Sequence, residues 1–407
     1  MPSSASQLET LLAEGRRHVF SSGVGDVAEA LCVENMARGI AKIRAAERTL
    51  GIEASALFVG APDATVTRNR ERWAHGFGYG GLVCWSPDIA VLDALPNGCG
   101  MLVSELEQLP PVDVLRARAR DLRERTLELD GVAIGYDLDE SNHFVDGCEL
   151  AETLVEDVDV PRFITVIHSS GKEHRERSPF GSGLYIHQSR ELSARAQRVA
   201  TPLGELALLS GAAAEAFYAF CERVQRFNHD RRELFARELF GEHRPLVNAT
   251  HQGFRAPGRF HLGSYWFDAS QACSTLLPLT LGPDQPVYLL RPLGPLGARG
   301  VDLLGWRERA TELGVADELE RSEVLPHGGG YAYPQLRRLV ELEPPPADAP
   351  AETQPRFVVE DLDGKQQRYE DIRAPAFAYR GDRVLERTLR LGLAEIVARY
   401  DVRYVVK

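Results

Sequence analysis

The chain of 407 residues lacks the sequence features of membrane and secreted proteins. It has no run of about 18 uncharged apolar residues, so no transmembrane helix is expected. Its first residues, Met1-Pro2-Ser3-Ser4, lack the basic and apolar regions of a secretory signal peptide. We therefore expect a cytoplasmic protein with no membrane partner.

Cysteine is scarce, and its spacing argues against two common uses. The six cysteines include no Cys-x-x-Cys pair, which speaks against both a disulfide framework and a zinc ribbon. Most of them are expected to be small buried hydrophobic residues. Cys99 differs, because Gly98 and Gly100 flank it and leave its thiolate open to a ligand.

The chain also lacks an excess of positive charge. Its net charge of -12 is not typical of a protein that binds nucleic acid non-specifically, so a nucleic-acid substrate would need a local basic patch. Three basic clusters are candidates, at Arg68–Arg72, Lys172–Arg177 and Arg223–Arg232. Taken singly, each is more simply interpreted as a solvated helix face, because its charges are of mixed sign.

Apolar residues, by contrast, are abundant enough for a large core, at 44% of the chain against 26% charged residues. Their spacing predicts helices at 26–50, 110–129, 212–240 and 384–400, and strands at 55–60, 82–85, 163–168, 286–290 and 403–406. Helices and strands alternate along the chain, which favours a mixed α/β fold. The strand at 163–168 would deliver His168 at its carboxyl end, where active-site residues of α/β proteins are common.

Five short clusters place a cysteine or a histidine next to glycine or amide residues, at 96–101, 141–146, 166–171, 248–252 and 326–330. The first four contain Cys99, His143, His168 and His251. One thiolate and three imidazoles form a ligand set for zinc, manganese, cobalt or iron, and softness alone favours zinc. A lone histidine is more often structural, but four such groups in glycine-rich or amide-rich turns favour a metal site.

The last cluster, Pro326-His327-Gly328-Gly329-Gly330, is suited to phosphate. Successive glycine N–H groups can form an anion-binding nest, and an imidazole beside it could attack phosphorus and carry a phosphoramidate. A flexible glycine loop with an incidental histidine is the alternative interpretation. Asn142 and Asp146 flank His143 and could bind a phosphate or a base edge, although the same residues also suit a plain turn.

In order, these motifs resemble those of the RtcB family, the GTP-dependent RNA-splicing ligases. The resemblance runs from about residue 75 to the end of the chain and rests on the following segments: His75-Gly76, Gly98-Cys99-Gly100, Asn142-His143-Phe144, His168-Ser169-Ser170-Gly171, His251-Gln252, His327-Gly328-Gly329-Gly330 and Val405-Val406-Lys407. It implies one large α/β domain over residues 1–407, with a divergent part at 1–70 and sheets enclosing a metal-containing cleft.

The resemblance also implies roles for single residues. Cys99 would bridge two metal ions, with His143 on one ion and His168 and His251 on the other, and His327 would accept GMP. Contacts to the guanylate are implied for Asn142, Phe144, Asp146, Gly328, Gly329, Gly330, Tyr379 and Lys407. The expected cofactors are GTP and Mn²⁺, with Zn²⁺ or Co²⁺ as alternatives. The expected partners are RNA 3′-phosphate or 2′,3′-cyclic phosphate ends, 5′-hydroxyl ends and an archease-like activator.

The chain departs from the family at several positions. Pro96 stands where relatives carry a metal-binding aspartate, so Asp93 or another group would have to replace it. Tyr331 follows the glycine loop where relatives have arginine, and His261-Leu262-Gly263-Ser264 lacks the family's basic pair. These departures leave two alternatives open: a nucleotidyltransferase with another acceptor, and a non-catalytic relative that binds nucleotide or metal.

Overall fold

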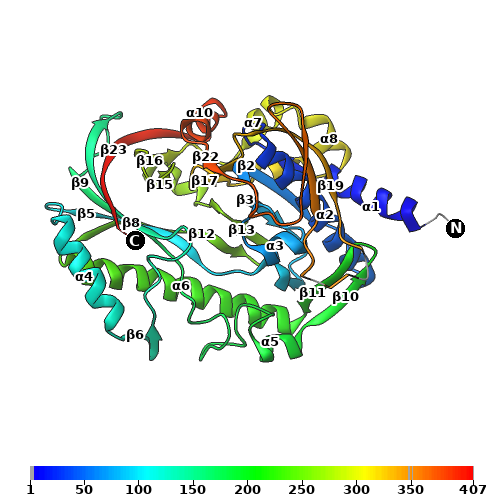
Figure 1. The fold of residues 1–407 in the computed structure, drawn as a ribbon, viewed down its shortest axis with the longest axis horizontal. Helices are drawn as coiled ribbons and strands as arrows, with labels where there is room; N and C mark the ends of the chain where they lie inside the picture. Colours follow the sequence, from blue (N-terminus) through cyan, green and yellow to red (C-terminus); the bar gives the residue numbers. More distant parts are fainter. Residues whose placement is uncertain (1–3, 347–348, 351, 407) are drawn as a thin grey trace.

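An eleven-stranded mixed sheet forms the centre of the protein, seen in a computed structural model that describes residues 4–346, 349–350 and 352–406 (Figure 1). In spatial order its strands are β1 (Val19–Ser21), β2 (Leu57–Thr65), β3 (Tyr79–Cys84), β13 (Arg259–Leu262), β12 (Arg244–Ala256), β5 (Cys99–Leu106), β9 (Phe163–Ser169), β8 (Phe144–Thr153), β23 (Ala394–Val406), β16 (Val287–Pro292) and β15 (Leu277–Thr280). The β1–β2 pair is parallel and the other neighbours are antiparallel. The prediction of a mixed α/β fold is confirmed.

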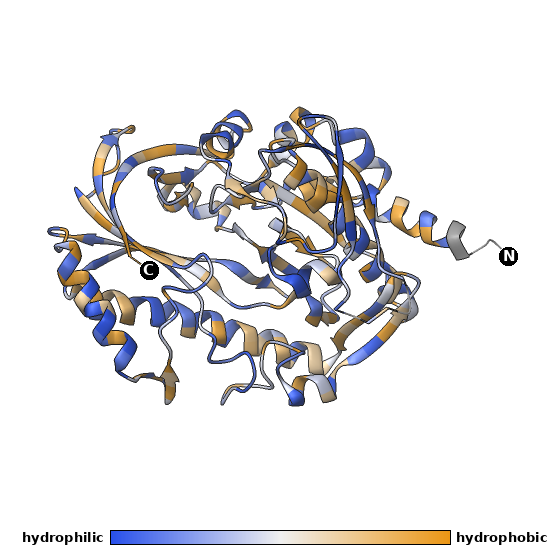
Figure 2. Ribbon diagram, in the orientation of Figure 1, coloured by the Kyte–Doolittle hydropathy of each residue, from blue (hydrophilic) through white to orange (hydrophobic). Residues whose placement is uncertain are grey.

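The helices cover the sheet and its edges. They are α1 (Ser4–Arg17), α2 (Val27–Thr49), α3 (Arg70–His75), α4 (Val112–Glu124), α5 (Arg190–Arg195), α6 (Ala212–Phe240), α7 (Gly297–Leu303), α8 (Arg307–Glu312), α9 (Ala316–Glu320) and α10 (Asp382–Arg390), with 3-10 turns at Leu92–Ala94 and Ala269–Ser274. The longest, α6, packs along β12 and β5 and begins and ends at the residues predicted from sequence (Figure 1). Its apolar residues recur at helical spacing, so orange and blue alternate along it in Figure 2.

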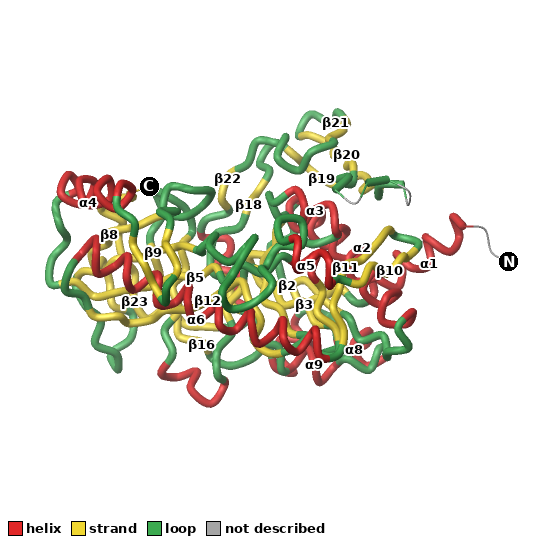
Figure 3. Tube along the Cα trace, turned by 90° about the horizontal axis from the view of Figure 1, so that it is seen from below, coloured by secondary structure: helices red, strands yellow, loops and turns green. Residues whose placement is uncertain are grey.

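Within the described part of the chain, five smaller sheets complete the fold. They are β10 (Gln197–Thr201), β11 (Gly204–Ser210) and β4 (Ile89–Val91); β14 (Ser264–Tyr265) and β17 (Leu325–Pro326); β18 (Tyr331–Ala332) and β22 (Ala378–Tyr379); β19 (Leu336–Glu343), β20 (Arg356–Asp361) and β21 (Gln366–Tyr369); and β6 (Leu127–Leu129) and β7 (Val132–Ile134). Figure 3 shows the β19–β20–β21 sheet to one side of the large sheet, with β18 and β22 between them.

Two of the predicted helices are wrong in part. The helix predicted at 384–400 ends at Arg390, and residues from Ala394 onward form β23, which pairs with β16 and β8. Gly392 has a φ of 68°, a left-handed conformation that ends the helix and lets the chain turn into the sheet. The helix predicted at 110–129 ends at Glu124, and its last residues form strand β6.

Side chains along the central strands point alternately to the two faces of the large sheet, and this alternation determines which face Cys99 and His168 share. Leu102 of β5 and Ile167 of β9 pack in one apolar cluster with residues of α6. Met101 and Val166, one position away, belong to a cluster on the opposite face of the sheet. Cys99 and His168 have the same parity as Met101 and Val166, and therefore lie on the face away from α6. No helix in the described ranges has both the length and the apolar character needed to cross a membrane.

Candidate functional site

Three of the predicted metal ligands lie on three neighbouring strands of the large sheet. Cys99 is the first residue of β5, and His168 is near the end of the antiparallel β9, so the two residues meet at one place in the sheet. On the other side of β5, Gln252 of β12 pairs with Cys99 and Thr250 pairs with Gly100. His251 is the extra residue of this β-bulge, which redirects its side chain. Sheet topology thus joins ligands that are remote in sequence.

The three side chains form a buried group that could hold a metal ion. Cys99 Sγ lies 3.2 Å from His168 Nε2, which lies 3.3 Å from His251 Nε2. The donor atoms all lie within 4.8 Å of one another, and all three residues are buried. Ligand atoms around one tetrahedral zinc ion are separated by roughly 3 to 4 Å, so this donor set fits a transition metal.

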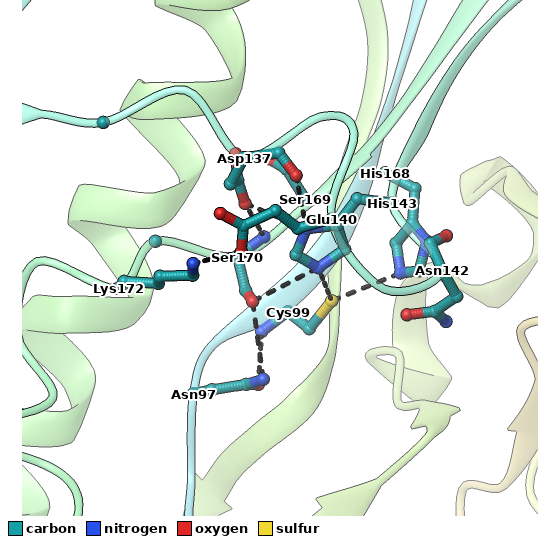
Figure 4. A network of polar contacts seen from close by, with 12 residues as sticks. Asn97, Cys99, Asp137, Glu140, Asn142, His143, His168, Ser169, Ser170 and Lys172 are labelled. Carbon is teal, nitrogen blue, oxygen red and sulfur yellow. Dashed lines mark hydrogen bonds and ion pairs between the residues drawn. The ribbon is translucent and has the colours of Figure 1, made fainter. Parts of the chain in front are cut away.

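Hydrogen bonds hold the imidazole ring of His168 and that of the neighbouring His143. His168 Nδ1 donates to the Asn142 carbonyl oxygen at 3.0 Å, which leaves the Nε2 lone pair facing the Cys99 sulfur. His143 Nδ1 lies 2.9 Å from the Asp137 carboxylate (Figure 4). Arg231 makes an ion pair with the same carboxylate at 2.8 Å. The contact of His168 with Asn142 and the contact of His143 with Asp137 each orient the Nε2 atom of the ring toward Cys99.

His143 lies beside the three-residue group and outside it. Its Nε2 is 3.7 Å from Cys99 Sγ and 3.4 Å from Ser170 Oγ (Figure 4). Pro96 contributes no donor here, and Asp93, the proposed replacement, is engaged elsewhere. The Asp93 carboxylate contacts His75 Nδ1 at 3.2 Å and accepts a hydrogen bond from the Ala207 N–H at 3.2 Å.

The electrostatics of the group favour a thiolate. Burial opposes ionisation of Cys99, but His168, His251 and His143 together hold the pKa of its thiol well below the usual value. Burial also opposes a charge on His143, yet the Asp137 carboxylate and Cys99 raise its pKa to about 10. Burial and the nearby His327 lower the pKa of His251. The neutral His251 and the Cys99 thiolate are the protonation states that bind metal.

His327 stands next to this group on the loop that follows β17. Its ring centroid lies 4.2 Å from that of His251 and 5.6 Å from that of Tyr79. Its Nδ1 donates to the Asp63 carboxylate at 2.9 Å, and its backbone N–H donates to the same oxygen at 3.2 Å. In the neutral ring this hydrogen bond leaves the lone pair on Nε2. The sequence analysis did not identify Asp63. The feature that could have identified it is a carboxylate within an otherwise apolar strand.

The predicted nucleotide-binding residues line one hollow beside His327. Its walls include Asp63, Asn142, Phe144, Asp146, His168, Gly328, Gly329, Gly330, Tyr331, Tyr379 and Val405. Gly329 lies so close to the backbone that a Cβ would come within 2.2 Å of the Leu281 oxygen, and Gly330 has a φ of 62°. These constraints explain two of the three glycines. Lys407 lies outside the described residues.

Two arginines beneath the metal group were misread in sequence as part of a solvated helix face. Arg231 and Arg232 of α6 are 1% and 0% exposed. Arg232 Nη1 donates to the carbonyl oxygens of Gly98 and Ser169 at 3.4 Å, and burial lowers its pKa to about 10. The spacing of apolar residues on α6 places both arginines on its buried face, and this spacing could have predicted their burial from the sequence.

The sequence matches no family model and no curated protein. What can be said of its function therefore depends on the geometry of this site.

Proposed function

We propose that the chain is a metal-dependent RNA ligase of the RtcB type. It would use GTP to join RNA 3′-phosphate or 2′,3′-cyclic phosphate ends to 5′-hydroxyl ends. One observation supports this proposal above all others: the rings of His327 and His251 are 4.2 Å apart, and Asp63 holds His327 Nδ1. The imidazole that we propose as the nucleophile thereby lies against the three-residue group that could hold a metal ion.

Asp63 would have two effects on His327 in this reaction. It fixes the tautomer in which Nε2 bears the lone pair, and it stabilises the positive charge that the ring acquires when Nε2 bonds to phosphorus. The hydrogen bond to the His327 backbone N–H also restrains the loop. Buried histidine–carboxylate pairs serve this purpose in other nucleophilic sites.

The metal ion would be held by Cys99, His168 and His251. When bound, it would neutralise negative charge on the phosphoryl oxygens. The metal identity is also part of the proposal: manganese is implied by the family resemblance, and zinc is favoured by the soft thiolate.

The adjacent hollow would take the guanylate. Amide and carboxylate groups of Asn142 and Asp146 can recognise a base edge or a ribose, and the aromatic rings of Phe144 and Tyr379 can pack against it. The glycine loop at 328–330 can approach phosphate oxygens without side chains in the way.

The reaction would proceed in three steps. His327 Nε2 attacks the α-phosphorus of GTP, forming a P–N bond and releasing pyrophosphate. An RNA 3′-phosphate oxygen, present from the start or formed when water opens a 2′,3′-cyclic phosphate at the 2′ oxygen, then attacks that phosphorus, breaking the P–N bond and restoring the free imidazole. Finally a 5′-hydroxyl attacks the activated 3′-phosphate, its proton passes to water, and GMP leaves.

The first test of this proposal is covalent labelling. Incubation with GTP and Mn²⁺ is expected to add one guanylate to the chain, as measured by intact mass. The bond should be acid-labile and alkali-stable, as phosphoramidates are. His327→Ala should abolish the label, and His229→Ala, at a half-exposed histidine on α6, should retain it. If the metal-loaded protein takes up no guanylate, the proposal is overturned.

Ligation separates the RNA acceptor from the alternatives. The guanylated protein is mixed with one RNA ending in a 2′,3′-cyclic phosphate and another beginning with a 5′-hydroxyl. Sealed product supports the RNA ligase. Label without sealed product supports a transferase with another acceptor, and metal binding without label supports a non-catalytic nucleotide-binding or metal-binding relative.

A further inference from the structure

A second hollow opens on the other side of Cys99. Its lining includes Cys99, His143, Ser170, Tyr185 and the segment 66–72, and its volume is about 420 Å³. Tyr79, Asn142 and Tyr331 line both this hollow and the one beside His327. The two hollows therefore meet at the metal group, and the second is larger than a phosphate ion requires. We call it the acceptor groove.

The acceptor groove is locally basic, although the chain has a net charge of -12. Five arginines and two glutamates line it: Arg68, Arg70, Arg72, Arg175, Arg373, Glu71 and Glu140. Glu71 contacts His187 at 2.9 Å, Glu140 pairs with Lys172, and Arg70 pairs with Asp371. The other four arginines form no ion pair within the described ranges. Two of the three basic clusters seen in the sequence thus converge here, and the arginines attract an anion.

Two of these arginines have unused hydrogen-bond donors. Arg68 Nη1 and Arg175 Nε are buried and have no hydrogen-bond partner within the described ranges, and neither guanidinium forms an ion pair there. Aromatic rings hold both groups in place: Arg68 lies 4.4 Å from the ring centroid of Phe377, and Arg175 lies 5.0 Å from that of Tyr185. Buried unpaired donors are costly, and phosphate oxygens are the acceptors that suit guanidinium.

An exposed aromatic cluster borders the groove where Arg68 is stacked. The Phe377 and Tyr379 side chains are 41% and 40% exposed, and both rings pack on Tyr331, with centroid distances of 4.9 and 5.7 Å. Aromatic rings beside arginines bind single strands, because every base can stack on them while the phosphates meet the cations. A small phosphate or a phosphorylated peptide would leave this platform unused.

We infer that the acceptor groove binds the phosphate-bearing end of a single-stranded RNA. Arg68 and Arg175 contact its phosphates, Phe377 stacks on a base, and the terminal phosphate points toward Cys99 and His143. This inference rests on the proposed function for the identity of the strand, and it names the residues that select the acceptor. His327 and the guanylate hollow lie beyond the groove.

The test is strand binding measured without GTP, so that it does not depend on guanylation. A fluorescent RNA of about ten nucleotides with a 3′-phosphate is titrated with the full chain at several salt concentrations, and anisotropy is measured. The double variant Arg68→Gln, Arg175→Gln should bind at least about tenfold more weakly, with a salt slope reduced by about two. Arg356→Gln, which removes an exposed arginine paired with Glu370, should bind like the parent.

Phe377→Ala gives an independent measurement should the double variant fold poorly, because this ring is half exposed. It should weaken binding severalfold with little change in salt slope, since it removes stacking and no charge. Parent-like affinity in both the double variant and Phe377→Ala, or tighter binding of a phosphoserine peptide of equal charge, overturns the inference. Guanylation of the parent without RNA binding overturns the groove alone. RNA binding without guanylation supports the groove and overturns the ligase mechanism.

Discussion

At the scale of single residues, the chemistry of this site comes from pairs that sequence spacing does not reveal. His327 and Asp63 are in contact, as are His143 and Asp137, although only the histidines were identified in advance. Histidine and cysteine next to glycine are rare enough to stand out. An aspartate can be assigned to such a pair only when its neighbour in space is known. The sequence contains too many carboxylates for one of them to be selected by its position alone.

His261 shows how burial acts on one titratable group away from the metal ligands. Its ring is 1% exposed and contacts Ser264 Oγ at 3.1 Å. Burial, with help from Arg259 and Arg255, lowers its pKa to about 3. In the unfolded chain a histidine has a pKa of about 6.5. Between these values the unfolded state binds one more proton, so the folded state loses stability as the pH falls.

We therefore predict that His261→Gln flattens the acid side of the stability curve. Between pH 6 and 4, one extra proton on the unfolded state changes the free energy of unfolding by about 1.4 kcal/mol per pH unit. The variant should lose about that much of the slope, as measured by urea denaturation of metal-free protein in EDTA. His243→Gln, on the loop after α6, is the matched control and should keep the parent slope. Equal slopes in the parent and His261→Gln would contradict the prediction.

At the scale of elements, the local sequence pattern predicted helices and strands correctly where the spacing of apolar residues alone determines the secondary structure. α6 and β9 follow from their apolar spacing and from β-branched residues, and both were predicted nearly to the residue. The strand predicted at 403–406 is also confirmed, as the end of β23, but the segment before it was predicted as helix because Ala394–Tyr400 has helix-forming residues. Pairing with β16 and β8 buries Val397, Ala398 and Tyr400 in the sheet, which overrides that propensity.

The β5–β12 pair is the element on which the metal group depends most. Gly100 follows Cys99 and faces α6, where a Cβ would lie 2.5 Å from the Ala249 oxygen and 2.7 Å from Arg232 Nη2. The Ala249 oxygen belongs to the neighbouring strand, so it cannot move without disturbing the bulge that carries His251. A side chain at this position would have to displace the backbone beside His251, one of the three candidate ligands.

Gly100→Ala is accordingly expected to reduce both stability and metal affinity. Overpacking of this kind costs about 1 to 3 kcal/mol of the free energy of unfolding. Displacement of Cys99 should weaken Zn²⁺ or Mn²⁺ binding in isothermal titration at least about tenfold, in line with other disturbances around metal ligands. Gly135→Ala is the control, because no atom lies within 4 Å of its added Cβ. Metal affinity equal to that of the parent would show that the bulge tolerates the shift.

At the scale of the whole molecule, the large sheet converts sequence separation into proximity. The strand order β12-β5-β9-β8 places side by side segments that begin at residues 244, 99, 163 and 144. Nothing in the composition or periodicity specifies that order, which depends on long-range pairing of strands buried on both faces. The candidate ligands could be selected from the sequence, but their convergence could not be derived from it.

A metal ion shared by β5, β9 and β12 would cross-link the middle of this sheet, so binding should stabilise the whole fold. A ligand at about 100 times its dissociation constant adds about 2.7 kcal/mol when it binds only the folded state. We predict that the unfolding temperature of the metal-free protein rises with added Zn²⁺, Mn²⁺ or Co²⁺, as followed by differential scanning fluorimetry. The ion giving the largest rise at equal concentration would be the best match to the site.

Two cysteine variants separate this effect from general binding of metal at the surface. Cys99→Ala removes the thiolate that holds the three-residue group together, so its unfolding temperature should no longer depend on metal. Cys273→Ala removes the exposed cysteine and should respond like the parent. A Cys99→Ala protein that still gains stability from these ions would place their binding site elsewhere, and the proposed metal centre would be wrong.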